Sequence, residues 1–540
     1  MKSANDLFRA KAHWETTSRL LATLINEGLV NFDTTRGELE NDLHVRISPR
    51  DEIEGYDHHS LLVRVRRESG DNALEAQVSR SLSPEDLQLP LVLNTTGGPV
   101  YNQLANSDPE TLFESIFPWL GYGSTCKAQI IKELRSSASF QEEWLSTHPS
   151  DFEPSLKSPS LDWEMAIVRG HPTHPMHRTL LAQPPLESVQ PGDLSSIKNP
   201  RICLISLPRS SMITVGPFEQ VLDSLITENG MEVPEVPEDR IIIPCLSRQL
   251  PAIVQHFGPS VAIISSVVLY GRAQASLRTI SLSTSRVFHY DLKFALACNI
   301  SSALRTITPW TALIRPEVSS ILDKVLPSDM WMCHEIAAAT GSDANFDKAK
   351  HCSVLIRENL EAKARARGET LIVSAALAER GVDSEFCHAE RVFGLQSEAQ
   401  KEIWFRQYTS KLLSCTLPPI YKSGVSLEGH SQNILARFHV EPQKLVGFAY
   451  RDFGGLKLHT PTLAQQGYEV KSSPPGSLIL TDNMRELWEN CHHTIFQSHL
   501  NQLLQALRLR KNRAWAIVRQ ESLKELDPDG NAHPSCYMSF

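Results

Sequence analysis

The sequence lacks the signals of several common protein classes. Its ten cysteines, from Cys126 to Cys536, include no Cys-x-x-Cys pair. A disulfide framework and a zinc knuckle are therefore not expected, and the pattern favours reduced thiols in a cytoplasmic protein. The longest strongly apolar stretch, Val261 to Tyr270, is about half the length of a membrane-spanning helix. Residues 1–28 mix acidic, basic and apolar side chains, which predicts an amphipathic helix and not a signal peptide.

An excess of positive charge is also missing. The chain has 53 basic and 62 acidic side chains and a net charge of −9, so neither nucleic acid nor an anionic membrane is expected as the main partner. Hydrophobic residues make up 41% and charged residues 21% of the 540 residues, as in folded globular proteins. We find no internal repeat. The length predicts roughly two to four domains, and small molecules are the expected partners.

Hydrophobic periodicity divides the chain into three regions and predicts an α/β fold of the α+β kind. The first region, 1–160, has helical patterns at 5–28 and 124–146, a strand at 61–66, and no polar cluster typical of a site. The second, 161–330, is rich in strand patterns: 202–207, 240–244, 261–269, 279–282 and 287–292. The third, 331–540, has helical patterns at 345–350, 358–380, 396–415 and 482–513, and strands at 438–440 and 446–450. The basic cluster Arg508, Arg510, Lys511 and Arg513 is predicted to end the last helix and offset its dipole.

Two His-Pro steps stand at His171 and His174. Each proline removes an amide donor and keeps the residue before it out of helical geometry, so both histidines are expected on a stiff loop. Rigid imidazoles on a loop indicate a binding site. A turn whose histidines face water is the alternative.

Hydroxyl and guanidinium groups recur downstream. Ser276, Arg278 and Thr279 stand together at a strand start, and Ser301 and Arg305 repeat the theme. Such groups bind phosphate or carboxylate oxygens. Lys293 lies between the two groups in an apolar stretch, where a bound anion would supply its counter-charge.

A further polar group follows in the third region. Glu428, His430, Gln432 and Asn433 lie close together in sequence, and Asp452 comes after the next strand. The two carboxylates are hard oxygen ligands suited to Mg²⁺, which binds through one or two carboxylates plus substrate phosphates. An N-cap acid and a turn aspartate are the structural alternatives.

Together and in this order, these motifs resemble the siderophore synthetases that work without a non-ribosomal peptide synthetase, the IucA/IucC or NIS synthetase family. The resemblance covers about residues 160–500. It implies an ATP- and Mg²⁺-dependent ligase that activates a carboxylic acid, often citrate, as an acyl adenylate. An amine or alcohol then displaces AMP to give an amide or ester, in siderophore or related secondary metabolism. It also implies a cupped-hand fold with an N-terminal thumb, β-rich fingers and an ATP-holding palm. Family members are commonly dimers, although the sequence shows no interface.

The resemblance also implies roles for single residues. It assigns ATP contacts to Ser276, Arg278, Thr279, Lys293, Gln432, Asn433 and Asp452, with Arg357 as a further phosphate candidate. Ser301, Arg305 and His430 would bind the carboxylate substrate, and Glu428 and Asp452 would hold magnesium. His171 or His174 would lie near the phosphates. The base for the incoming nucleophile would be His430 or a histidine of the His-Pro loop, with a pKa near neutrality.

The segment after the His-Pro steps departs from the family pattern of a lysine, an arginine and a glycine. Arg178, Leu180 and Ala182 stand at these positions. Arg178 keeps the charge in a different geometry, whereas Leu180 loses a charge. A smaller or less charged acid than citrate is therefore a hypothesis for the substrate.

Two other function classes compete with this prediction. A metalloprotein or metal-dependent hydrolase would use histidines, namely His171, His174, His177, His492 and His493. A non-catalytic binding protein on the same fold is the second alternative.

Overall fold

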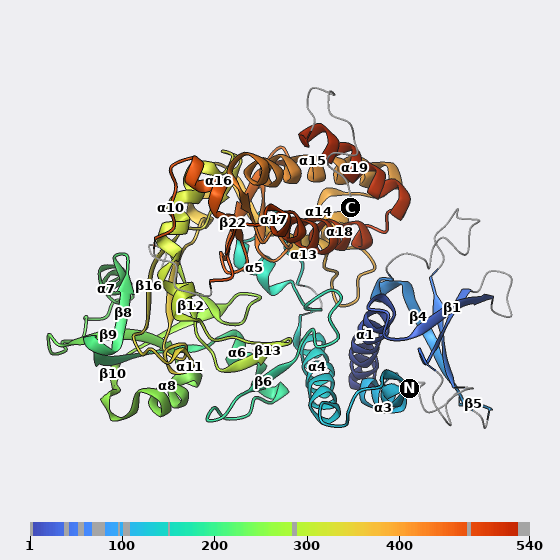
Figure 1. The fold of residues 1–540 in the computed structure, drawn as a ribbon, viewed down its shortest axis with the longest axis horizontal. Helices are drawn as coiled ribbons and strands as arrows, with labels where there is room; N and C mark the ends of the chain where they lie inside the picture. The colour runs from blue at the N-terminus through green and yellow to red at the C-terminus, as the bar shows by residue number, and fades with distance from the viewer. Residues whose placement is uncertain are drawn as a thin grey trace.

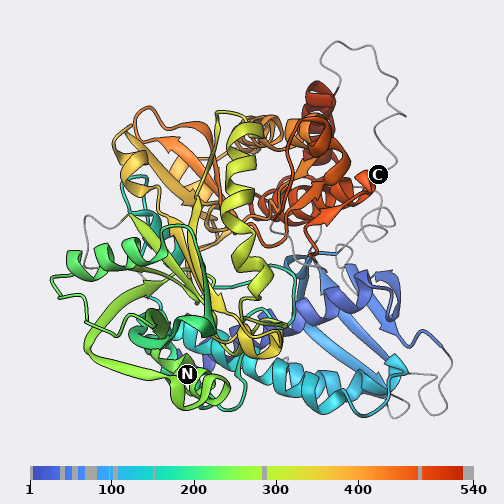
Figure 2. The ribbon, with the colours of Figure 1, turned by 60° about the vertical axis from the view of Figure 1, so that its left-hand side comes forward.

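In a computed structural model of the protein, the structure describes residues 4–36, 43–51, 59–66, 82–95, 98–100, 108–149, 152–282, 289–471 and 477–526. The described strands form five sheets. Three groups of elements occupy different corners of the molecule in Figures 1 and 2: the N-terminal elements in blue, the strand-rich middle in green, and the C-terminal elements in orange and red. Each group is built around one of the three large clusters of buried apolar side chains.

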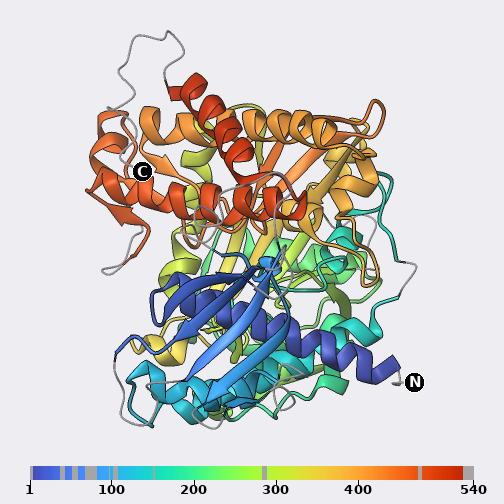
Figure 3. The ribbon, with the colours of Figure 1, turned by 90° about the vertical axis from the view of Figure 1, so that its right-hand side faces the viewer.

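The N-terminal group is a five-stranded antiparallel sheet covered by helices. Alternating burial along β2 and β3 turns one face of the sheet to the helices. The strands, in sheet order, are β1 (Asn31–Arg36), β2 (Leu43–Ser48), β3 (Ser60–Val65), β4 (Leu87–Thr95) and β5 (Gly98–Val100). The helices are α1 (Ala4–Asn26), α3 (Pro109–Ile116) and α4 (Lys127–Thr147). Figure 3 shows this sheet, in blue, below the C-terminal helices.

An eight-stranded sheet forms the middle of the molecule. Its order is β8 (Met212–Val215), β16 (Glu335–Gly341), β17 (Val354–Glu358), β12 (Tyr290–Phe294), β11 (Thr279–Leu282), β10 (Ala262–Ala273), β7 (Arg201–Pro208) and β9 (Arg240–Leu246). The region limits at 160 and 330 stay predictions. However, β16 and β17 follow residue 330 and still pair with the strands before it. The helices α6 (Leu194–Lys198), α7 (Phe218–Glu228), α8 (Leu250–Phe257), α9 (Pro309–Leu313) and α11 (Phe346–Ala349) complete this part.

The C-terminal group packs helices on a four-stranded sheet. The sheet order is β15 (Met330–Met332), β21 (Lys444–Tyr450), β20 (Ile434–His439) and β18 (Glu369–Val373). The long helix α15 (Glu398–Ser423) begins at a capping box between Ser397 and Gln400 and ends at Gly424, which has φ +67°. The other helices are α5 (Ser160–Met165), α10 (Arg315–Val325), α12 (Glu361–Arg365), α13 (Ser374–Ala378), α14 (His388–Phe393) and α16 (Thr460–Gln465).

Two three-stranded sheets join these layers. One contains β14 (Ala303–Leu304), β13 (Cys298–Ile300) and β6 (Leu180–Ala182). The other contains β19 (Val425–Ser426), β22 (Lys457–His459) and β23 (Leu480–Thr481). The predicted strand 287–292 begins within residues that the structure does not describe and is found as β12 from Tyr290.

The helical prediction for 358–380 is wrong in its centre. Gly368, at φ +67°, ends the short helix α12, and the chain then enters β18. The run Leu371, Ile372 and Val373 pairs with β20 and is buried on both faces. A continuous apolar run of this length fits a buried strand as well as a helix, and the sheet decides between them.

The prediction of one helix over 482–513 is also wrong. The chain forms α17 (Met484–Cys491), a π-helical segment η7 (His492–Leu500) and α18 (Asn501–Ala506), then breaks before α19 (Lys511–Leu526). Arg508 lies in the break at φ +54°. The basic cluster therefore does not end a helix, because Lys511 begins one. Arg510, Lys511 and Arg513 instead pair with Glu398 at 2.8 Å, Asp86 at 2.9 Å and Glu402 at 3.3 Å.

None of the described helices combines the length and the apolar character needed to cross a membrane. The nine cysteines within the described residues are free thiols, and seven of them are buried.

Candidate functional site

The Ser-x-Arg-Thr motif forms a tight turn between β10 and β11. The Ser276 hydroxyl accepts the amide N–H of Thr279 at 3.2 Å and donates to the Thr279 hydroxyl at 2.9 Å. Leu277, between them, has φ +59°, a conformation that costs a non-glycine residue roughly 1–3 kcal/mol. Thr279 is the cross-strand partner of Lys293 on β12. The turn thus brings its hydroxyls beside the buried lysine.

Arg278 and Arg305 lie against each other. The Arg278 guanidinium donates to the carbonyl oxygens of Arg305 at 3.0 Å and Thr306 at 3.3 Å. Arg305 donates to the carbonyl of Ile300 at 3.0 Å, beside the turn residue Ser301, which has φ +58°. Burial lowers the pKa of Arg278 to about 10 and also lowers the pKa of Arg305. Neutral carbonyls hold both guanidiniums, so their charge is available to an anion.

Asp452 is the centre of a cluster of cations. Its carboxylate pairs with Lys293, and Arg315 lies 3.9 Å from its second oxygen. Burial would raise the pKa of Asp452, but the charges of Lys293, Arg315 and Arg278 hold it well below its usual range. Burial lowers the pKa of Lys293 to about 8, and Asp452 opposes this shift. The counter-charge of Lys293 is therefore Asp452 of the protein itself, whereas the sequence analysis expected a bound anion.

Arg315 is a cation that sequence reasoning missed. It begins α10, is 2% exposed, and donates to Glu335 at 2.5 Å. The Oε1 atom of Glu335 is buried without a hydrogen-bond partner among the described residues. An arginine before a proline at a helix start is common, so the sequence holds no specific signal for this role.

Glu428 lies beside Asp452 and is partly protonated at neutral pH. Burial, followed by the Asp452 charge, raises the pKa of Glu428 to about 7. A Cβ on Gly455 would stand 2.3 Å from the Glu428 carboxyl carbon, so a side chain there would displace this carboxyl group. The Asn433 amide donates to Glu428 Oε2 at 3.3 Å. Two neighbouring carboxylates repel each other until a proton or cation lies between them, and their hard oxygens fit Mg²⁺.

The π-helical segment η7 holds the Glu-Gly-His loop from behind. The Gly429 amide donates to the Thr494 hydroxyl at 3.2 Å, and His499 Nδ1 donates to the Gly429 carbonyl at 3.0 Å. Tyr408 Oη lies 2.8 Å from both His499 Nε2 and Ser374 Oγ. Both backbone polar groups of Gly429 are thereby fixed. Short π-helical segments of this kind are frequent at functional sites.

The same loop carries His430 and Gln432. Burial lowers the pKa of His430 to about 4, against the opposing charge of Asp452. The Gln432 carbonyl accepts two hydrogen bonds from Arg451, at 2.9 and 3.1 Å. The near-neutral pKa expected for His430 as a base is therefore wrong, because burial lowers this pKa to about 4.

The His-Pro loop fixes the tautomers of its two histidines. His171 Nδ1 accepts the amide N–H of His174 at 3.1 Å, and His174 Nδ1 accepts that of Met176 at 3.0 Å. Because a backbone N–H only donates, both Nδ1 atoms are unprotonated and each neutral ring carries its proton on Nε2. Burial lowers the pKa of His171 to about 3 and also lowers that of His174. The rings are therefore neutral donors, and for His171 the expected near-neutral pKa is wrong.

The loop histidines do not form a metal site. His177 Nδ1 lies 2.6 Å from the Arg169 carbonyl, and its Nε2 lies 3.2 Å from the Thr16 hydroxyl. Within the described residues, no group of three or more His, Cys, Asp or Glu side chains could hold a metal ion. The structure gives the metalloprotein alternative no support.

The residues that replace the family pattern after the His-Pro steps face inward. Arg178 donates to the Val168 carbonyl at 3.1 Å, and its guanidinium carbon lies 4.0 Å from the Trp144 ring centroid. Leu180 is 2% exposed and pairs with Ile300, next to Ser301. Ala182 lies on the same strand, β6. Neither Arg178 nor Leu180 brings a charge to the Ser301 turn.

Arg357 differs from the other predicted phosphate ligands. It is 3% exposed and donates to Asp291 at 3.0 Å and to Gln274 at 2.7 Å. Burial would lower the pKa of Arg357, but the charge of Asp291 outweighs it and raises this pKa. A phosphate would reach this guanidinium only if the buried pair opened.

Arg451 connects the turn at Ser276 to the loop that carries Gln432. It donates to Glu164 at 2.6 Å and to Gln274 at 3.1 Å, besides its bonds to Gln432. Glu164 in turn accepts the amide of Ala275 at 3.1 Å. Neither Arg451 nor Glu164 was selected as a site residue from the sequence, because these two partners are far apart in the chain.

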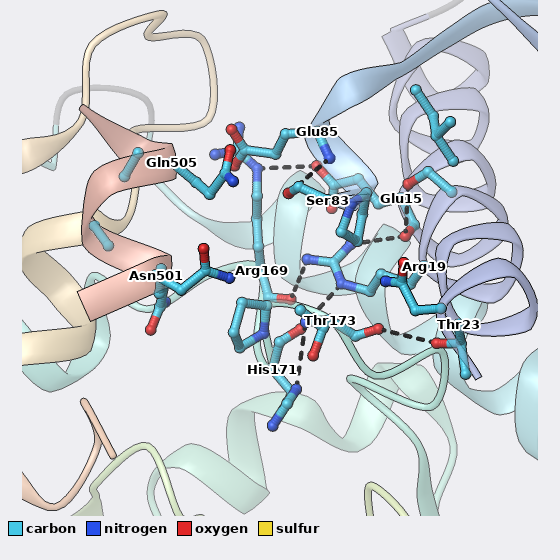
Figure 4. Close-up of a pocket in the computed structure, with 18 of the residues that line it drawn as sticks. Glu15, Arg19, Thr23, Ser83, Glu85, Arg169, His171, Thr173, Asn501 and Gln505 are labelled. Atoms are coloured by element: carbon cyan, nitrogen blue, oxygen red, sulfur yellow. Dashed lines mark hydrogen bonds and ion pairs between the residues drawn. The ribbon is translucent and has the colours of Figure 1, made fainter. Parts of the chain in front are cut away.

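A large cavity, which we call the α1–α18 cavity, lies beside this site. It measures about 1070 Å³ and is bounded by α1, the start of β4, the His-Pro loop, the residues after α13, η7 and α18. Figure 4 shows side chains from α1 and α18 facing each other across it. The first region, in which the sequence shows no polar cluster typical of a site, contributes α1 and the start of β4 to its walls. The polar lining of the cavity includes Glu15, Arg19, Glu85 and Lys511.

Two family models match the chain. The model described as the IucA / IucC family matches residues 260–379, which include Arg278, Lys293 and Arg305. The model described as ferric iron reductase FhuF-like transporter matches residues 402–527, which include Glu428 and Asp452.

Curated relatives match over most of the chain. It is 34% identical over 530 residues to the NRPS-independent siderophore synthetase-like protein ankE of Aspergillus thermomutatus, covering 96% of this chain and 86% of that protein. It is 31% identical over 413 residues to the NRPS-independent siderophore synthetase rfs of Rhizopus delemar, covering 74% of this chain and 64% of that protein.

Solved structures share the fold. The petrobactin biosynthesis protein AsbB of Bacillus anthracis superposes with a TM-score of 0.77 at 16% identity, over 98% of this chain and 89% of that chain. The ATP-bound aerobactin synthetase IucA of Klebsiella pneumoniae superposes with a TM-score of 0.72 at 16% identity, over 95% of this chain and 92% of that chain.

Proposed function

The chain belongs to the IucA/IucC family of NRPS-independent siderophore synthetases, and we propose that it is an ATP-dependent ligase that forms an acyl adenylate from a carboxylic acid. The acyl group then passes to an amine or alcohol. The family and the mixed helix-and-sheet fold were both predicted from the motifs, and the comparisons confirm these two predictions. IucA, which shares this fold, is ATP-bound in its solved structure, and this supports extending ATP use to this chain.

The proposed reaction has two displacement steps. An oxygen of the substrate carboxylate attacks the α-phosphorus of ATP, the bond to the bridging oxygen breaks, and pyrophosphate leaves. The amine or alcohol then attacks the acyl carbon, AMP leaves, and the nucleophile gives up its proton. Since the substrate carboxylate is the first nucleophile, the enzyme needs no reactive serine or cysteine. Its task is to position the reactants and to stabilise negative charge on oxygen.

One observation carries the proposal: four cations from separate elements meet around one carboxylate. Arg278, Lys293, Arg305 and Arg315 all act on Asp452 electrostatically or pair with it. With Ser276 and Thr279 beside them, Arg278 and Lys293 would hold the ATP phosphates. Ser301 and Arg305 would hold the acid, and Gln432 and Asn433 would contact the nucleotide.

The histidines take the role of neutral donors in this proposal. The Nε2–H groups of His171 and His174 would donate to phosphate oxygens, and His430 would contact the acid. An anion bound beside these rings would raise their pKa values from about 3 for His171 and about 4 for His430. Proton transfer from the nucleophile would then follow binding and not precede it.

We place Mg²⁺ at Glu428 and Asp452. The ion would replace the proton that the raised pKa of Glu428 indicates, and it would neutralise phosphate oxygens as the charge on them grows. Asn433, which already donates to Glu428, would orient that carboxylate. The pair of carboxylates leaves the remaining coordination to water and phosphate, as Mg²⁺ prefers.

The acid substrate is proposed to be less charged than citrate. Leu180 lies next to the Ser301 turn without a charge, and Arg178 is turned into the core. Exchange of labelled pyrophosphate into ATP, measured with a panel of mono-, di- and tricarboxylic acids, tests this. A strong preference for citrate would overturn the substrate assignment and leave the ligase assignment intact.

The same exchange assay tests the residue map. Arg305→Ala should abolish acid-dependent exchange while ATP still binds, because Arg305 is placed on the acid. Arg278→Ala should instead weaken ATP binding. Losing one cation that stabilises a developing charge typically costs about 10²–10³-fold in rate. If both variants exchange at the wild-type rate, the map is wrong.

A homodimer in the cytoplasm remains a prediction from the resemblance and the thiol content. Light scattering on the purified chain checks the oligomeric state.

A further inference from the structure

Apart from His171, the groups placed on ATP and the acid lie outside the α1–α18 cavity. Arg278, Lys293, Arg305 and Asp452 are not among the residues that line it. Its volume, about 1070 Å³, is at the upper end of the range for small-molecule sites. The cavity therefore has room for a molecule that the adenylation step does not use.

One end of the cavity reaches the reaction centre. His171 and His493 both line it. Gln502 also lines it and accepts a hydrogen bond at 2.5 Å from the hydroxyl of Ser431, the residue after His430. His430 in turn feels the charges of Asp452, His493 and Arg305. A molecule in the cavity would lie next to an acyl group held at Arg305.

The N-terminal wall of the cavity is charged but balanced. Arg169 pairs with Glu15 at 2.9 Å and Glu379 at 3.4 Å, and Arg380 pairs with Glu85 at 2.7 Å. Bringing a polyanion against these carboxylates would be repulsive, because their guanidinium partners are already engaged. An uncharged or singly cationic molecule meets no such penalty.

Arg19 adds no free anion site to this wall. Its guanidinium donates to the backbone carbonyls of Glu15 at 2.7 Å, His171 at 3.0 Å and Arg169 at 3.4 Å. Figure 4 shows it joining α1 to the His-Pro loop. Its five N–H donors are largely committed, so it fixes the loop instead of holding a carboxylate.

The opposite wall offers neutral hydrogen-bonding groups. Asn501 and Gln505 stand one turn apart on α18, are half-buried, and have no side-chain partner among the described residues. Figure 4 shows both side chains directed across the cavity toward α1. A free amide both donates and accepts, which suits hydroxyl, amine and amide groups of a ligand.

We propose that the α1–α18 cavity binds the nucleophile of the condensation, a polar amine or alcohol that is neutral or singly cationic and carries further hydrogen-bonding groups. This assignment rests on the proposed ligase function. Asn501 and Gln505 bind the far end of the molecule, and its reacting amine or hydroxyl points past His493 to the acyl carbon. The segment η7, which lines the cavity, also fixes Gly429 through Thr494 and His499. A molecule that contacts η7 therefore affects the position of the neighbouring residues Glu428 and His430.

The test separates adenylation from acyl transfer. Asn501→Ala and Gln505→Ala are combined, with Gln220→Ala on the exposed face of α7 as the matched control. Acid-dependent pyrophosphate exchange requires no nucleophile, and hydroxylamine traps the acyl adenylate without needing a shaped pocket. Ethanolamine, putrescine, L-ornithine and L-lysine are then compared as nucleophiles.

The double variant should exchange pyrophosphate and form hydroxamate within about twofold of wild type, while kcat/KM for the preferred amine falls at least tenfold through KM, a loss of about 1.4 kcal/mol. Equal loss of exchange would assign the cavity to ATP or the acid and overturn the inference. Unchanged KM for the amine would overturn it as well, and so would a wild-type enzyme that uses hydroxylamine but none of the four amines. A wild-type enzyme with no exchange for any acid would refute the ligase function itself. If the double variant does not fold, Asn501→Ala alone makes the same distinction.

Discussion

The cation cluster around Asp452 and the His-Pro loop both suit anionic ligands, but they are built in opposite ways. In the cluster, Lys293 is 4% exposed and already paired with Asp452. In the loop, His171 and His174 are neutral, and each uses Nδ1 to bind its own backbone. The cluster therefore holds formal charges whose pairing a bound anion must change, whereas the loop offers neutral N–H donors that backbone hydrogen bonds hold in place. The cluster should be sensitive to charge, and the loop to shape.

The largest effect is expected from breaking the cluster with Asp452→Asn. The substitution leaves the Lys293 ammonium buried without its counter-charge, which should lower the free energy of unfolding by about 3–5 kcal/mol. Exchange should fall below detection, since the proposed magnesium ligand is lost too. Urea unfolding and the exchange assay measure the two effects. Asp329→Asn, which removes an exposed pair with Lys411, is the control and should change little.

Removing the charge of Glu428 should have the opposite effect to Asp452→Asn, because it should stabilise the protein. The pKa of Glu428 is raised from 4.5 to about 7 in the folded protein. The protonated carboxyl therefore stabilises the fold fully below pH 4.5, and this stability is lost as the pH rises to about 7. In magnesium-free buffer, Glu428→Gln should be more stable than wild type above pH 7, by up to roughly 3 kcal/mol.

The measurement is urea unfolding of both proteins between pH 5 and pH 9. Glu428→Gln should also lose magnesium-dependent exchange. Parallel stability curves for the two proteins would show that Glu428 is an ordinary ionised carboxylate and would contradict the raised pKa.

The smallest effect is expected in the loop. His171→Asn keeps an oxygen that can accept the amide of His174 but loses the Nε2–H donor, so exchange should fall roughly tenfold with little change in stability. His171→Phe loses both groups and should also destabilise the protein by about 1 kcal/mol. Thermal unfolding and KM for ATP distinguish the two variants. If His171→Asn behaves as wild type, the ring is only a turn residue.

Much of the site could be predicted because its residues come in short local motifs. Arg278, Lys293, Arg305 and Asp452 were all selected from the sequence, and the structure brings them together although their roles remain proposals. The strands β11, which follows Arg278, and β12, which carries Lys293, were also recognisable, because both are largely buried and apolar.

The missed residues share a different property. Arg315, Glu164 and His499 act through partners 20 to 287 positions away, such as Glu335, Gly429 and Arg451. The helix predicted over 482–513 failed for a related reason. Its break at Arg508 depends on the ion pairs that Arg510 and its neighbours make with other elements.

The sequence by itself determined the kinds of groups at the site, their order and the family to which the chain belongs. Motif spacing and residue chemistry are local properties, so they can be recognised in the sequence alone. Only the tertiary structure decided which charges are neutralised. It paired Lys293 with Asp452 and Arg357 with Asp291, and it placed α1 across a cavity from α18. These outcomes depend on distances between remote segments, because Coulomb energy and desolvation vary with separation and burial in space and not with separation along the chain.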